Sequence, residues 1–220
     1  MDLYTQLVNI EELHQRREDT SYAERLQHIA VYQRQRAQQT YEDLLQQPRY
    51  RPAMQFLLDD VFGTPDHFER DCQMKRAYRN MIKLLPKDVV DTLTEAITLH
   101  ALSMQLDHEM ALHCMNAECA LNSIEDYARL VAVANKEAQR RRQVELILNV
   151  GRDLDKLVKN RFVLTALKLA RRPAEMAGIL ALHNYLEEGI AAFKAMKGAK
   201  VFMQAIQARE TQWLDHVYTT

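Results

Sequence analysis

Glycine and proline are scarce in this chain, which has only five of each among its 220 residues. Because these two residues interrupt helices most strongly, their scarcity leaves few places where a helix is forced to end. The sequence also lacks any run of 18 apolar residues, so no transmembrane helix is expected. The first residues show no basic segment followed by an apolar one, and no secretory signal peptide is expected.

Cysteine is also rare, and the three cysteines Cys72, Cys114 and Cys119 form no C-x-x-C pair. This odd number predicts reduced thiols in a cytoplasmic protein, where cysteine commonly serves as a small buried hydrophobic residue. The formal net charge of −1 gives no overall attraction to nucleic acid or to acidic substrates. The local signatures of hydrolases, a G-x-G-x-x-G motif and a phosphate loop are absent too.

The residues that dominate the chain are good helix formers: Ala, Leu, Gln, Glu, Arg, Lys and Met. We therefore predict an all-α fold, a single-domain multi-helix bundle of about eight helices over residues 1–220.

The helix pair in residues 1–47 has few apolar positions, which predicts a peripheral place at the surface or at an assembly contact. The helix at 87–118 has two apolar faces and should be central. One long helix is predicted at 138–171, with an apolar stripe that includes Leu154, Leu157, Phe162 and Thr165.

The most informative feature is a pair of polar residues on the apolar seam of the helix at 87–118. His100 and Asp107 lie seven residues apart on the same face, where Leu would be expected. A buried imidazole and a buried carboxylate both need polar partners. A second apolar seam carries His183, and Glu187 follows one turn later, so we expect the two seams to face each other.

A mononuclear metal site is one interpretation of these polar residues, with Zn or Fe as the metal that such ligands suit. Its candidate ligands are His100, Asp107, His183 and Glu187. We favour the alternative, that these residues are hydrogen-bonded within the core and bind no cofactor. A di-iron carboxylate bundle is not expected, because it needs two E-x-x-H motifs and only Glu11 and His14 form one. No catalytic residue is predicted.

Residues 56–62, Phe-Leu-Leu-Asp-Asp-Val-Phe, are followed by Gly63, Pro65, Phe68 and the pair Arg70-Asp71. This segment resembles a family of uncharacterised bacterial helical proteins that is named after its FFLEELY motif. Similar pieces occur at 84–86, 101–107 and 187–189, so the resemblance covers most of the chain. It implies a soluble helical domain without an assigned function, and it transfers no catalytic residue.

The same segment also has a physical interpretation. Asp59 and Asp60 lie near the C-terminal end of a short predicted helix, where a carboxylate is unfavourable unless a cation pairs with it. We expect Arg70 to be that cation, with Asp71 pairing nearby and Asp66 capping the next helix. We interpret the group as a structural clasp, because buried ion pairs commonly fix geometry without doing chemistry.

Charge is segregated between two of the predicted helices. Residues 136–172 hold eleven Lys and Arg against four Asp and Glu, whereas residues 87–126 hold one Lys against eight Asp and Glu. The densest basic cluster, Arg140–Arg142, has the charge to bind phosphate or nucleic acid. We favour the alternative that the basic helix pairs with the acidic one inside the molecule.

These patterns favour a non-catalytic cytoplasmic interaction or ligand-binding protein. We expect a homo-oligomer or a protein partner, no membrane partner and no nucleic acid. The main alternative is a metal-dependent, oxidoreductase-like enzyme of the helical-bundle type that uses the four candidate ligands. A weaker alternative is an anion- or nucleic-acid-binding regulator that uses the Arg140–Arg142 cluster.

Overall fold

The computed structural model describes residues 3–63, 67–117 and 121–219, and of residues 81, 82 and 84 it describes only the backbone. The chain is 86% helical, and the described residues contain twelve α-helices and no strand. This confirms the all-α prediction, although the count exceeds eight. None of these helices is long and apolar enough to cross a membrane. They are α1 (Leu3–Gln15), α2 (Thr20–Thr40), α3 (Glu42–Gln46), α4 (Arg51–Asp60), α5 (Phe68–Leu84), α6 (Lys87–Ala117), α7 (Ile124–Val133), α8 (Glu137–Leu157), α9 (Arg161–Leu169), α10 (Arg171–Met176), α11 (Leu180–Ala195) and α12 (Lys200–Thr219).

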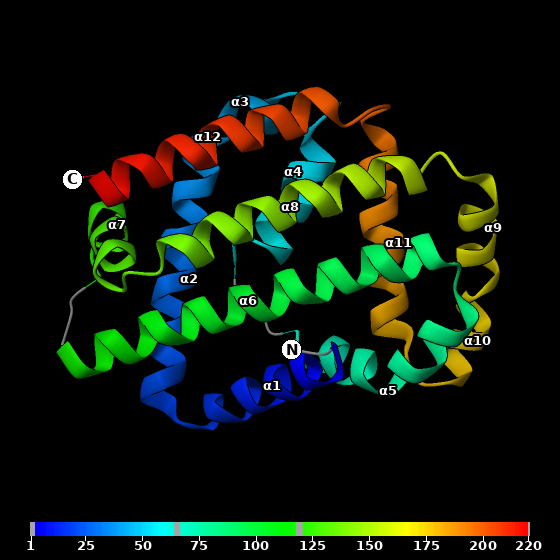
Figure 1. Cartoon of the computed structure of the whole chain (residues 1–220), viewed down its shortest axis with the longest axis horizontal. Helices are drawn as coiled ribbons and strands as arrows, with labels where there is room; N and C mark the ends of the chain where they lie inside the picture. The colour runs from blue at the N-terminus through cyan, green and yellow to red at the C-terminus, as the bar shows by residue number, and fades with distance from the viewer. Residues whose placement is uncertain (1–2, 64–66, 118–120, 220) are drawn as a thin grey trace.

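Helix α6 lies at the centre of the molecule. It runs beside α8, which in turn runs beside α12, while α1 and α5 lie along the opposite side of α6 (Figure 1). Three hydrophobic clusters form the core, and α6 contributes to each of them, with Leu99 in the first, Met110 in the second and Ile97 and Met104 in the third. The predicted central position of this helix is therefore confirmed.

The long helix predicted at 138–171 is wrong, because the chain breaks between α8 and α9. The side chain of Asn160 accepts hydrogen bonds from the backbone N–H groups of Phe162 (3.0 Å) and Val163 (3.4 Å), and so it caps a new helix. The buried part of the predicted stripe ends at Val158, and Phe162 is 70% exposed. An Asn side chain that bonds to nearby backbone competes with a continuous helix, and here it outweighs the apolar periodicity.

The N-terminal helices α1 and α2 pack against α6, and α1 also packs against α5. Although their apolar faces are thin, Leu7, Ile10 and Ile29 are almost completely buried. The side chain of Asp19 caps α2 by accepting from the backbone N–H groups of Ser21 (3.0 Å) and Tyr22 (3.3 Å). These contacts place α1 where its side chains reach α5 and α6.

The cysteines differ from the predicted set of reduced thiols. Cys72 is a free thiol and is half-buried. Cys114 is buried and disulfide-bonded, so the prediction is wrong for this residue. Cys119 and Asp66, for which a thiol and a helix cap were predicted, lie outside the described residues.

Candidate functional site

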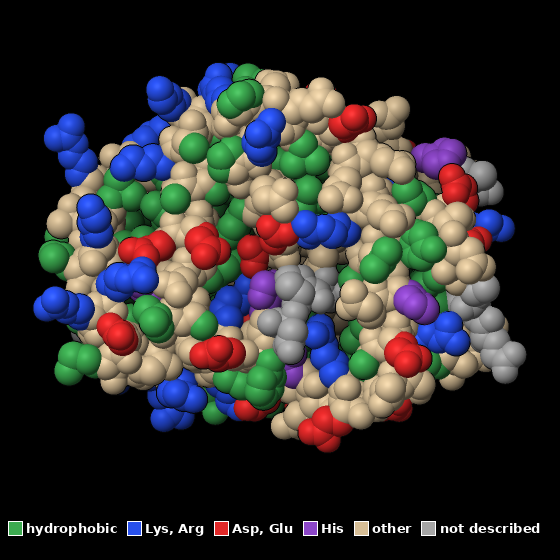
Figure 2. Space-filling view, turned by 180° about the vertical axis from the view of Figure 1, so that it is seen from behind, with side chains coloured by type: hydrophobic (Ala, Val, Ile, Leu, Met, Phe, Trp, Pro, Cys, Tyr) green, Lys and Arg blue, Asp and Glu red, His purple; other side chains and the backbone are tan. Residues whose placement is uncertain are grey.

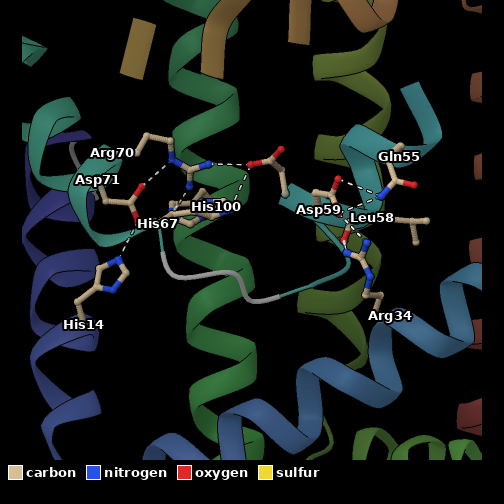
Figure 3. A network of polar contacts seen from close by, with 10 residues as sticks. His14, Arg34, Gln55, Leu58, Asp59, His67, Arg70, Asp71 and His100 are labelled. Carbon is tan, nitrogen blue, oxygen red and sulfur yellow. Dashed lines mark hydrogen bonds and ion pairs between the residues drawn. The ribbon is translucent and has the colours of Figure 1, made fainter. Parts of the chain in front are cut away.

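A buried carboxylate, Asp71 of α5, joins three parts of the fold (Figure 3). It accepts hydrogen bonds from Nε2 of His14 in α1 (2.8 Å), Nε2 of His100 in α6 (2.7 Å) and Nε of the adjacent Arg70 (3.0 Å). Burial by itself would raise the pKa of Asp71, but the charge and hydrogen bond of His100 lower it. The hydrogen bond of His14 and the charge of Arg70 add to this effect, so the pKa of Asp71 lies far below its ordinary value.

Arg70 carries the network on to α4. The terminal nitrogen Nη1 of Arg70 donates a hydrogen bond to Asp60 at the end of α4 (2.9 Å). The guanidinium also lies over the ring of Tyr185 in α11, 4.4 Å from the ring centroid. Asp59 is paired separately with Arg34 of α2 (2.6 Å). The prediction that Arg70 is the cation at the end of this short helix is confirmed, and the group holds α4, α5, α6 and α11 in place.

A small polar pocket lies beside this network, with a cavity volume of about 20 Å³. That volume holds one or two water-sized groups. Its walls come from α1 and the turn that follows it, the end of α4 and the residues after it, and α6. The lining residues are His14, Arg17, Asp60, Val61, Gly63, His67, His100, Ser103, Met104 and Asp107.

Four residues of this lining have a buried polar atom without a hydrogen-bond partner among the described residues. These atoms are Oδ1 of Asp107, Nε of Arg17, Nε2 of His67 and Nδ1 of His14. Nε2 of His67 does lie 3.2 Å from an oxygen of Asp60, but it does not form a hydrogen bond there. A buried polar group without a partner is costly, so the presence of four around one small cavity marks it as the candidate functional site.

Asp107 is the most unusual group in the pocket. It is only 3% exposed, and the nearest cation, a terminal nitrogen of Arg140 in α8, is 4.0 Å from its Oδ1. Burial raises the pKa of Asp107 to about 6, against the opposing charges of Arg140 and Arg17. Its carboxyl group therefore exchanges a proton near neutral pH, unlike that of Asp71.

The four candidate metal ligands separate into two pairs. His100 and Asp107 both line the pocket, where His100 is bonded to Asp71 of α5 and Asp107 lies nearest Arg140 of α8. Nε2 of His183 lies 3.4 Å from Glu187 on its own helix. Among the described residues, α11 thus supplies a polar partner to neither His100 nor Asp107, and the expectation that it would supply at least one is wrong. Among the residues that the structure describes, no three His, Cys, Asp or Glu side chains are placed together to hold a metal ion.

The basic cluster Arg140–Arg142 is paired inside the molecule, but among the described residues only Arg140 lies near a carboxylate of the acidic helix, Asp107 at 4.0 Å. Arg140 is buried and bonded to Gln143 (3.1 Å), Arg141 pairs with Glu137 and Asp215, and Arg142 pairs with Glu145. Helices α6 and α8 pack along each other, so the acidic and basic segments of the sequence are neighbours in the fold. This arrangement leaves no unpaired arginine in the cluster.

Sequence reasoning missed three lining residues of the pocket, namely His14, Arg17 and His67. A signal existed for His14, because it lies four residues after Ile10 on the apolar side of α1, and both are buried. No local pattern marked Arg17 or His67. They lie at the ends of elements, and only the packing of α1 and α5 against α6 brings them to Asp107.

The fold and the pocket define an all-α protein with a buried His–Asp–His network beside a cavity that contains unpaired polar atoms. The chain belongs to the family of a domain of unknown function, DUF8198, whose family model matches residues 12–220. This match does not show the FFLEELY motif. No curated protein and no solved structure matches the chain.

Proposed function

We propose that the protein is a non-catalytic binding protein and that the pocket beside Asp107 takes a small polar group. The observation that carries this proposal is that four residues lining one cavity each have a buried polar atom without a hydrogen-bond partner among the described residues. Leaving such atoms without partners costs roughly 1–3 kcal/mol each. A ligand that supplies the missing partners recovers that free energy when it binds.

The unbonded atoms also limit the chemistry of the ligand. Ionised Asp107 can only accept hydrogen bonds, and Nε of Arg17 can only donate one. A matching group therefore carries at least one N–H or O–H donor and one acceptor. The small cavity volume admits only the end of a molecule, such as a carboxamide or an amino group next to a carbonyl.

Acid–base catalysis by Asp107 is the second candidate function. A carboxyl group whose pKa is about 6 is well suited to transfer protons near neutral pH, and His67 and His100 line the same cavity. We favour binding because the cavity has no room for both a reacting bond and a second substrate group. This catalytic alternative uses no metal, in contrast to the enzyme suggested by the sequence.

The test is binding of small probes to the full chain: acetamide, glycinamide, guanidinium and acetate. We expect acetamide or glycinamide to raise the melting temperature and to shift the NMR signals of residues around the pocket, and acetate to do so least. The Asp107→Leu variant should lose this response. Asp91→Leu is the matched control, because Asp91 is exposed on the same helix, and it should keep the response.

The proposal fails if no probe binds to the wild type or if Asp107→Leu binds as the wild type does. Asp107→Leu removes the carboxylate nearest to buried Arg140, so thermal melts must verify its folding, and Asp107→Asn, which keeps the shape of the side chain, serves as a second variant. A crystal structure in which ordered water bonds to all four atoms and no probe displaces it would also contradict the proposal. Conversion of a probe by the wild type would favour the catalytic alternative.

A further inference from the structure

Helices α9 and α10 lie at one end of the molecule (Figure 1), and they leave large apolar side chains in solvent. No residue of α9 is buried. Among the described residues, the three most exposed large hydrophobic side chains are Met176 (89%), Leu169 (73%) and Phe162 (70%). Single exposed hydrophobic residues are ordinary, but three neighbours on two short consecutive helices form an apolar face that needs a physical explanation.

The three residues recur at intervals of seven. Phe162 and Leu169 therefore lie on the same side of α9, and Met176 follows at the end of α10. The connecting residue Ala170 keeps a helical backbone (φ −74°, ψ −9°), so the chain makes no wide loop between the two helices. The inner side of α9 packs against the rest of the molecule, since Val163, Leu164 and Leu167 are half-buried. The outer side is left without a partner in the described residues.

Basic side chains surround this apolar face. Arg161, Lys168 and Arg172 are exposed, and no hydrogen bond or ion pair is found for their side chains among the described residues. The space-filling view shows Lys and Arg side chains among hydrophobic ones at the same end of the molecule, which is the left end in Figure 2. We call the set Arg161, Phe162, Lys168, Leu169, Arg172 and Met176 the α9–α10 face.

The basic residues of α8 and of the turn after it behave differently. Arg142 pairs with Glu145 (2.5 Å), Lys156 with Asp153 (2.6 Å) and Lys159 with Asp155 (2.7 Å). Arg171 of α10 also pairs with a carboxylate, Glu187 of α11 (2.6 Å), whereas no ion pair is found for the side chains of Arg161, Lys168 and Arg172 among the described residues. The partner of the α9–α10 face is therefore expected to be anionic.

We propose that the α9–α10 face docks on an anionic lipid surface. A short helix with exposed Phe, Leu and Met between Lys and Arg side chains can insert its apolar side at the headgroup boundary, while its cations meet the headgroup phosphates. This is attachment at the surface, so it needs no membrane-spanning helix. The sequence pattern predicts no membrane partner, and it places Phe162 on an apolar helix stripe instead of an exposed face.

A second copy of the chain fits this face less well. Two copies related by a two-fold axis would bring the cations of one face against those of the other, which is unfavourable. A face built on two short helices is also far smaller than the roughly 800 Å² per partner that stable interfaces bury. Nucleic acid would meet the cations but would leave the three apolar side chains in water. The lipid surface satisfies both features, and it does not involve the Asp107 pocket.

Vesicle flotation with the full chain tests the proposal. We expect binding to vesicles that mix phosphatidylglycerol with phosphatidylcholine and weak binding to phosphatidylcholine alone, with affinity falling as salt is raised. The variants Phe162→Ser and Lys168→Glu should each weaken binding by about tenfold. Val201→Ser and Lys200→Glu are the matched controls, because both residues are exposed on α12, and these variants should bind as the wild type does.

Equal binding to neutral and anionic vesicles would overturn the proposal, as would loss of binding in the α12 controls. A protein that ignores vesicles but dimerises in solution, with a dimer that Phe162→Ser disrupts, would assign the face to a second copy instead. A monomer that binds no vesicle would also overturn it. Thermal melts of each variant verify folding, which substitutions at such exposed positions should leave nearly unchanged.

Discussion

Asp71 and Asp107 are both buried carboxylates close to one small pocket, yet their surroundings are opposite. Asp71 is 4% exposed and accepts hydrogen bonds from His14, His100 and Arg70, and its pKa lies far below the ordinary value. Asp107 is 3% exposed, its Oδ1 has no hydrogen-bond partner in the described chain, and burial raises its pKa to about 6. Burial is the same in both cases, so the difference comes from the donors around each group.

The contrast separates a group that holds the fold together from a group that is available to a ligand. The three donors of Asp71 come from α1, α5 and α6, so this carboxylate fixes the three helices that surround the pocket. Asp107 gains no such bonds, and the charges of Arg140 and Arg17 offset only part of the desolvation cost of its own charge. A perturbed pKa in a cavity is a marker of functional sites, and here it distinguishes Asp107 from the better-bonded carboxylate.

The largest effect is expected from Asp71→Ala. Removing this carboxylate leaves His14, His100 and Arg70 without their shared acceptor, and breaking a buried ion pair in this way typically costs about 3–5 kcal/mol. Urea unfolding at pH 7 measures the loss in the free energy of unfolding. Asp91→Ala is the exposed control and should change it by less than about 0.5 kcal/mol. A loss below about 1 kcal/mol for Asp71→Ala would mean that the network does not hold the helices.

A change of opposite sign is expected from Asp107→Asn. The pKa of Asp107 is raised from 3.8 to about 6 on folding, so between these pH values the folded state binds more protons than the unfolded state. Stability from this group therefore falls as pH rises through that range and stays low above it. The neutral Asn variant should be more stable than the wild type at pH 7, by up to about 3 kcal/mol.

The pH dependence of this gain distinguishes it from a packing effect. The difference between Asp107→Asn and the wild type should shrink toward zero as the pH is lowered to about 4, where Asp107 is protonated in the folded state. Asp71 should behave in the opposite way, since its lowered pKa gives stability that is present above about 4 and is lost in acid. Urea unfolding over a series of pH values measures both. A gain that is constant with pH would contradict the assignment to charge.

A smaller loss is expected from His100→Leu. This variant removes one of the donors of Asp71 and keeps an apolar side chain in the same place, so the loss should be about 1.5–2 kcal/mol, typical of a hydrogen bond to a charged group. Calorimetric melts at pH 7 provide the measurement. A loss of stability as large as that of Asp71→Ala would show that the three donors do not contribute separate, additive amounts to the stability of the network.

The smallest effect on stability is expected from Arg17→Gln, within about 1 kcal/mol, because Arg17 is half-exposed. Its charge lowers the pKa of Asp107, so the variant should raise that pKa further while it leaves Asp71 ionised. Carbon-13 NMR of labelled aspartate measures the carboxyl titration. An unchanged Asp107 titration would indicate that Arg17 does not face this carboxylate.

Much of the fold followed from local features of the sequence. The scarcity of glycine and proline predicted the all-α class, and the two apolar faces of residues 87–118 predicted the central place of α6. The pairing of Arg70 with Asp60 followed from carboxylates at a helix end. The break at Asn160 could not be predicted from local features. A capping side chain ends an apolar stripe only where the following helix lies outside the core, as α9 does.

The candidate site was found only in part. His100 and Asp107 were identified because they interrupt an apolar seam, but His183 interrupts a seam as well and does not line the pocket. Its Nε2 lies 3.4 Å from Glu187, one turn along its own helix, and has no hydrogen-bond partner among the described residues. Periodicity shows that a polar residue lies on a buried face, whereas its partner depends on which helices meet there. The contacts of Arg17 and His67 arise from that packing and leave no local trace.

The pKa of Asp107 itself is the most direct test of the contrast between the two carboxylates. Carbon-13 NMR of the aspartate carboxyl groups, assigned with Asp107→Asn and Asp71→Asn, follows both titrations in one sample. We predict that Asp107 titrates near 6 in the free protein and that a bound amide or amine probe shifts this value. Titration of Asp107 at or below the ordinary value of 3.8, like that of Asp71, would contradict the claim that its Oδ1 has no hydrogen-bond partner in the described chain.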